Sequence, residues 1–113
     1  MAASDLTSLA PPFAMQRVTL EATATNAREI QLPGWARSVY VTFTSSGGAA
    51  EAGKMSHEGT DGSALGNNHM PVPSGSALTL PINVGRSTGA RSIFVVGSSA
   101  SAYAHVTVMG QEA

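Results

Sequence analysis

The run SVYVTFT, residues 38–44, is the strongest evidence in the sequence for the class of fold. In it, Val39, Val41 and Phe43 alternate with residues that carry hydroxyl groups. Successive side chains of a β-strand point to opposite faces of the sheet, so this period of two predicts a strand with one buried face. The segment is the clearest strand signal in the chain, and the rest of the fold prediction extends from it.

The same alternation recurs on both sides of residues 38–44. The segments that carry it are RVTLEATAT (17–25), REIQLP (28–33), SALTLPINV (76–84) and AYAHVTVM (102–109), and a short apolar strand, SIFVV (92–96), lies among them. The pattern predicts an inward-facing set of Val18, Leu20, Ile30, Leu32, Val39, Val41, Phe43, Leu78, Leu80, Ile82, Val106 and Val108.

Turn residues separate these segments at intervals of about ten residues, and no amphipathic helix of useful length is present. With a further short strand near residues 64–70, the chain has six or seven expected strands. This spacing predicts an all-β fold, a single antiparallel β-sandwich or jelly-roll-like domain. Pro81 falls inside a strand and indicates an edge strand or a bulge. Residues 45–63, with five glycines, are expected to form a long loop.

The chain is expected to form one domain, residues 17–113, preceded by an extended N-terminal arm, residues 1–16. The arm shows no periodicity and contains Pro11 and Pro12, which favour extended chain. It nevertheless carries four large apolar side chains. We therefore expect the arm to be mobile in an isolated protomer and to pack against a neighbouring subunit or another component of an assembly.

Charge is scarce: 12% of residues are Asp, Glu, Lys or Arg, against about 25% in an average soluble domain. There is no basic block to attract nucleic acid, and no apolar stretch approaches the roughly 20 residues that span a membrane. The N-terminus lacks the features of a secretory signal. Cysteine is absent, which excludes disulfides, thiol catalysis and thiolate metal sites. The sparse charge suits a surface that partners cover, although a soluble monomer with a Ser- and Thr-rich surface remains an alternative.

The residues that could perform chemistry do not form a recognisable site. His57, His69 and His105, with Glu58 and Asp61, match neither a zinc nor a calcium motif. There is no G-x-S-x-G elbow. The string GGAAEAGK lacks the Ser or Thr, and the following helix, of a phosphate loop. A carboxylate pair for glycoside hydrolysis stays an open alternative, although the seven acidic residues are dispersed. We expect a non-enzymatic protein without catalytic residues, cofactor or metal.

Trp35, just before the clearest strand, has two possible roles. It is either a core residue at the strand entry or an interface anchor, because tryptophan is enriched among binding hot spots. The candidate assembly contacts of the chain are Leu6, Leu9, Phe13, Met15 and Trp35.

Three segments resemble small virion proteins of tailed bacteriophages. They are REIQLPGWARSVYVTF (28–43), MPVPSGSALTLPI (70–82) and SIFVVGSSASAYAHVTVM (92–109). The resemblance covers about residues 28–109 and rests on structural motifs alone, so it identifies no functional residues. It implies a β-sandwich component of the virion, most simply a capsid cement (decoration) protein. Such a protein would bind the major capsid protein on the outer surface of the capsid as a homotrimer.

Two other classes remain open. One is a receptor- or carbohydrate-binding module of a phage tail or spike, which glycan binding would support. The other is a small hydrolase, which measurable turnover would support.

Overall fold

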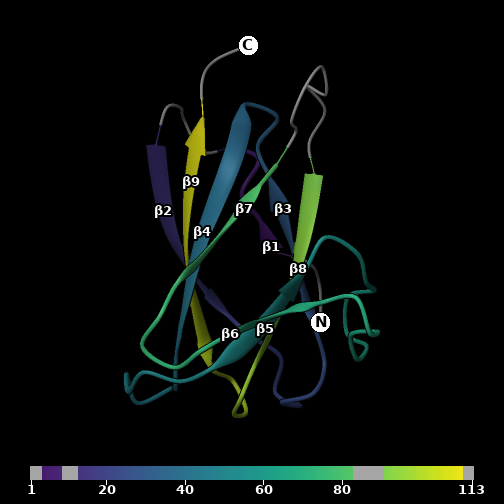
Figure 1. The fold of residues 1–113 in the computed structure, drawn as a ribbon, viewed down its shortest axis with the longest axis vertical. Helices are drawn as coiled ribbons and strands as arrows, with labels where there is room; N and C mark the ends of the chain where they lie inside the picture. Colours follow the sequence, from purple (N-terminus) through teal and green to yellow (C-terminus); the bar gives the residue numbers. More distant parts are fainter. Residues whose placement is uncertain (1–3, 9–12, 83–90, 111–113) are drawn as a thin grey trace.

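The computed structural model describes residues 4–8, 13–82 and 91–110, which form nine strands (Figure 1). These residues contain no helix, and so none that is long and apolar enough to cross a membrane. In chain order the strands are β1 (Ser4–Asp5), β2 (Phe13–Thr19), β3 (Arg28–Leu32), β4 (Ala36–Thr44), β5 (Gly53–Ser56), β6 (Met70–Val72), β7 (Leu78–Pro81), β8 (Arg91–Gly97) and β9 (Tyr103–Gly110).

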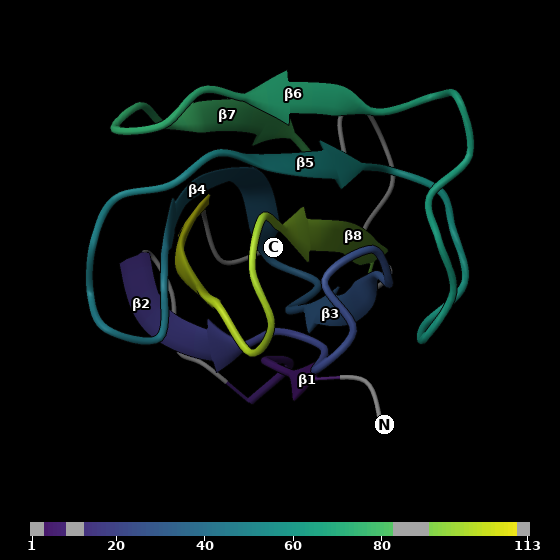
Figure 2. The same cartoon turned by 90° about the horizontal axis from the view of Figure 1, so that it is seen from below.

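The strands form two sheets that face each other, as the view along the molecule shows (Figure 2). The five-stranded sheet has the order β1-β3-β8-β5-β6, and the four-stranded sheet has the order β2-β9-β4-β7. Every pair of neighbouring strands is antiparallel except β1 and β3, which run parallel over two residues. The architecture confirms the predicted all-β sandwich.

The space between the sheets is filled by the predicted inward-facing residues. Eleven of the twelve are buried, and the remaining one, Leu78, is partly buried and packs against them. The core also includes Met55 from β5 and Ile93 and Val95 from β8. The period-two pattern therefore identified the core, because each strand turns its apolar face to the opposite sheet.

The beginning of the chain differs from the expected pattern. Strand β2 begins at Phe13, so the expected boundary between residues 16 and 17 falls inside a strand. Further upstream, Leu6 is 3% exposed, belongs to the core, and donates its backbone N–H to the Gln31 carbonyl oxygen at 2.8 Å. The described parts of residues 1–16 thus contribute β1 and the start of β2 to the two sheets of the sandwich. The chain leaves β2 at Thr19, which puts Ala22 on the surface although the alternation assigned it to the inward face of a strand.

The middle of the chain contains a strand that the sequence pattern did not indicate. Strand β5 lies within residues 45–63, which were expected to form a loop, and it pairs with both β6 and β8. Its four residues contain one large apolar side chain, which is too little for a visible alternation. The strand expected near residues 64–70 is instead the three-residue β6, which begins at Met70. Pro81 lies in β7 at the edge of the four-stranded sheet, as predicted.

Candidate interaction surface

The two outer faces of the sandwich differ in how they are covered. The outer face of the five-stranded sheet is partly covered by the chain itself, because Leu65 packs against Ala27 and against Phe94 and Val96 of β8. The covering loop, residues 57–69, is attached to the start of β3, because the Ala27 N–H donates to the Ser63 carbonyl oxygen at 2.8 Å. Both faces of β8 are therefore buried, which explains its unbroken run of apolar residues.

The four-stranded sheet has an outer face of a different kind. Strand pairing aligns its outward-facing residues in rows across β2, β9, β4 and β7. From β2 to β7, the first row is Phe13, Met109, Ser38 and Pro81, and the second is Met15, Thr107, Tyr40 and Thr79. No residue of either row is charged.

These two rows hold a cluster that we call the outer apolar patch: Phe13, Met15, Tyr40 and Met109. Phe13 is 53% exposed, Met15 68% and Tyr40 42%, while Met109 is half-buried. Three of the four large apolar side chains that the described residues expose thus gather on one face, the fourth being Met70. Contiguous exposed apolar side chains of this kind mark interaction sites more often than single ones do.

The next two rows are polar and bound the patch. The Arg17 guanidinium lies over the ring of Tyr103, with 4.2 Å between Cζ and the ring centroid. Beside them, His105 Nε2 and Thr44 Oγ1 are 2.8 Å apart in a hydrogen bond. Arg17 is the one Lys, Arg, Asp or Glu residue in the four rows, and a cation–π contact already engages it.

The predicted assembly contacts separate into different places. Phe13 and Met15 lie together on the outer apolar patch, whereas Leu6 is in the core and Leu9 falls outside the described residues. Trp35 packs against the core cluster, as expected for a core residue at the strand entry, but it is only partly buried. Tyr40 and Met109 were not among the candidates. Alternation does place them on the polar faces of their strands, but only the pairing of β4 and β2 with β9 brings them beside Met15 and Phe13.

The histidines and acidic residues of the middle segment do not assemble into a metal centre. Residues 55–58 and 67–70 line a groove of about 480 Å³ that includes His57, Glu58 and His69. Glu58 accepts a hydrogen bond from Asn68 Nδ2 at 2.9 Å, and His69 Nδ1 bonds the Gly66 carbonyl oxygen at 2.9 Å. Across the described ranges, no three His, Asp or Glu residues are placed to hold a metal ion. The polar groups of the groove bond to one another and hold the two chain segments together.

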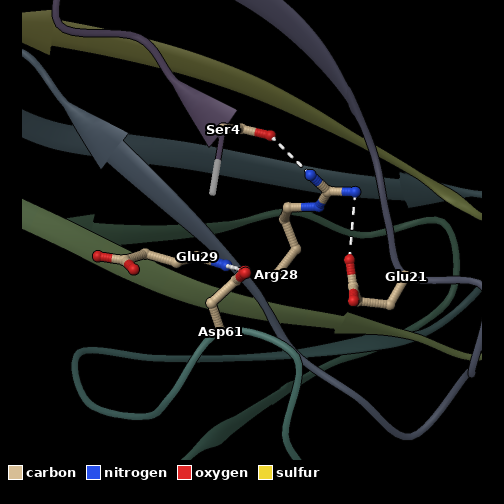
Figure 3. A network of polar contacts seen from close by, with 5 residues as sticks. All are labelled: Ser4, Glu21, Arg28, Glu29 and Asp61. Atoms are coloured by element: carbon tan, nitrogen blue, oxygen red, sulfur yellow. Dashed lines mark hydrogen bonds and ion pairs between the residues drawn. The ribbon is translucent and has the colours of Figure 1, made fainter. Parts of the chain in front are cut away.

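A buried polar network joins β3 to the N-terminal strand and to the covering loop (Figure 3). Arg28 Nη2 lies 3.2 Å from Glu21 Oε2, and both side chains are less than a tenth exposed. Arg28 Nη1 also donates to Ser4 Oγ at 3.5 Å, the long limit of a hydrogen bond. Next to them, the Glu29 N–H donates to Asp61 Oδ1 at 2.8 Å, which gives Asp61 a structural role. These contacts fasten separate segments of the chain to β3.

Comparison with protein-family models, with curated proteins and with solved structures found no match.

Proposed function

We propose that this protein is a non-enzymatic structural component of a tailed-phage virion, a capsid cement protein that binds the major capsid protein on the outside of the shell. The observation that carries the proposal is the outer apolar patch, where Phe13, Met15 and Tyr40 are each more than two-fifths exposed on a sheet face without charge in their rows. Phe13 and Met15 are also two of the assembly contacts that the sequence suggested.

The chemistry of the patch suits a protein partner. The cores of protein interfaces are depleted of charge and enriched in aromatic residues and methionine. The patch is made of two aromatic and two methionine side chains, with hydroxyl groups of Ser38, Thr79 and Thr107 between and beside them. It is built on regular strands of a sheet, so its side chains are held in place by the sandwich before binding.

A receptor- or carbohydrate-binding module is the second candidate, and one observation favours it. Tyr40 and Phe13 are exposed aromatic side chains, which sugar rings can stack upon. A ligand site of this kind also needs convergent polar groups to orient the ligand. The two rows offer hydroxyl groups for that purpose but no carboxylate or amide side chain, so the protein partner is preferred.

Co-sedimentation with capsid shells of the cognate phage, stripped of cement protein, tests the proposal. The double variant M15K/Y40K places two charges on the patch, and S46K/S74K adds the same charges at exposed loop positions away from it. We expect the wild type and S46K/S74K to sediment with shells and M15K/Y40K to stay in the supernatant, with circular dichroism unchanged in all three. Wild-type protein that remains in the supernatant would overturn the proposal, and binding to a glycan array would favour the second candidate.

A further inference from the structure

Strand β2 is an edge of the four-stranded sheet, and no described strand pairs with the side of β2 that faces away from β9. Leu20 N–H donates to the Ala102 carbonyl oxygen at 2.8 Å, in the same register as the β2–β9 pairs. Hydrogen-bonded pairs alternate along an antiparallel ladder, so the even-numbered residues of β2 bond to β9. The N–H and C=O groups of Phe13, Met15, Arg17 and Thr19 therefore point away from β9.

No other described strand occupies this edge. The four-stranded sheet ends at β2, and within residues 4–8, 13–82 and 91–110 the one hydrogen bond on that side is from Gln16 Nε2 to the Arg17 carbonyl oxygen, at 3.5 Å. Seven residues of strand thus present a row of backbone donors and acceptors, which is a template for another strand.

The other three edge strands of the two sheets are protected. Strand β7 contains Pro81, strand β6 has three residues including Pro71, and strand β1 has two residues. Proline removes a donor from an edge, and a very short edge offers few bonds to a partner. Among the described strands, β2 is the one edge that is both long and free of proline.

We infer that β2 pairs antiparallel with β2 of a second copy of this chain. In the register that uses the whole strand, Gln16 lies opposite Gln16 of the second copy, and Met15 lies opposite Arg17. The four residues whose N–H and C=O groups point away from β9 then form hydrogen-bonded pairs across the two copies, Phe13 with Thr19 and Met15 with Arg17. No like charges lie directly opposite each other, because each Arg17 faces a methionine.

The symmetry of this pair explains why the partner is a second copy. A two-fold axis perpendicular to the sheet relates two antiparallel β2 strands, so each strand supplies what the other needs. The pairing continues the sheet across both copies and keeps both outer apolar patches on the same side, close to the axis. It makes a dimer in place of the expected trimer, and it does not depend on the proposed capsid role.

The association should be weak and depend on concentration. A pair of seven-residue strands buries much less surface than the roughly 1,200–2,000 Å² of a standard protein interface. Light scattering on the full chain over a wide concentration range should show a rise from the 11.5 kDa mass of one chain to twice that mass.

The variant M15P tests the backbone pairing, because proline removes an N–H that points to the second copy and none that bonds β9. The control M15T removes the same side chain but keeps the N–H. We expect M15T to dimerise and M15P to remain monomeric with an unchanged unfolding transition. A monomeric or trimeric wild type, or an M15P variant that dimerises as the wild type does, overturns the inference.

A disulfide test covers the case in which M15P fails to fold. The chain has no cysteine, so Q16C introduces one thiol, placed by the register directly opposite its copy in a non-hydrogen-bonded pair. The Cα atoms of such pairs lie about 4.5 Å apart, within the range that a disulfide spans. We expect Q16C to cross-link under mild oxidation and T79C, on the opposite edge of the sheet, to stay reduced; equal cross-linking of the two overturns the inference. A protein that dimerises in this way without binding capsids would remove the proposed function and leave this inference standing.

Discussion

At the residue scale, Gly53 shows how closely β5 approaches β4. A Cβ atom at this position would lie 2.5 Å from Cδ2 of Phe43, whose side chain is buried in the core. We expect G53A to lower the free energy of unfolding by about 1–3 kcal/mol, the usual cost of overpacking a core. Denaturant unfolding measures this. G66A is the matched control, because nothing lies within 4 Å of its added Cβ, and it should stay within about 0.5 kcal/mol of the wild type. Equal effects would show that the Phe43 ring has room to move.

The ion pair between Glu21 and Arg28 is a second residue-scale feature. Both side chains are more than nine-tenths buried, so removing one charge leaves the other in an environment of low polarity. We expect E21Q to destabilise the fold by about 3–5 kcal/mol, measured by denaturant unfolding. The double variant E21L/R28M removes both charges together and should cost less than E21Q. An E21Q variant as stable as the wild type would mean that water reaches the pair.

Asp5 is the residue whose titration the local structure alters. The Thr7 hydroxyl donates to its carboxylate, as does the Thr7 N–H at 2.9 Å, and these bonds lower the pKa of Asp5 below its ordinary 3.8. A lowered folded-state pKa gives stability that is present above the unfolded pKa and lost as the pH falls through the folded pKa. We expect T7A to raise the pKa of Asp5 in an NMR titration and T7S to leave it low. The same value in both variants would show that the hydroxyl bond does not form in solution.

At the scale of elements, β1 holds the chain start against β3 through two pairs of residues and the buried side chain of Leu6. We expect L6A to lower the free energy of unfolding by about 2–5 kcal/mol, because it leaves a cavity in the core. S8A, at an exposed position two residues further on, should have little effect in the same denaturant experiment. A neutral L6A would return Leu6 to the role of an assembly contact. For the same reason, deleting residues 2–15 should lower the melting temperature.

The elements also show where sequence patterns carry enough information. Strands β3, β4 and β9 were predicted well, because each contains at least two large apolar residues spaced two apart on one face. Strand β5 was missed because Met55 is its one large apolar residue. The strand order of the two sheets lay beyond local patterns, since alternation along one strand says nothing about its neighbours.

At the scale of the whole molecule, the scarcity of charge should govern binding. The chain has six basic and seven acidic residues, and the outer apolar patch contains none of them. We expect binding to particles to change little between about 50 and 500 mM salt, because ionic screening acts on charged contacts. The dissociation constant measured across that range checks this. A steep rise with salt would show that charged residues outside the patch carry the interaction.

Local patterns in the sequence were enough to predict the fold class and most of the core, and they contain no recognised catalytic motif. Alternation is a local property of the chain, and a sheet with one buried face imposes it directly, so Val39, Val41 and Phe43 could be assigned to the core without knowing their partners. Tertiary structure decided the rest. It joined Phe13, Met15, Tyr40 and Met109 into one patch, because the pairing of β2 and β4 with β9 aligns residues distant in sequence. It also covered the outer side of β8 with the chain's own loop and left the patch on the other sheet exposed, since that loop is fastened to β3 by contacts between segments that are distant in sequence.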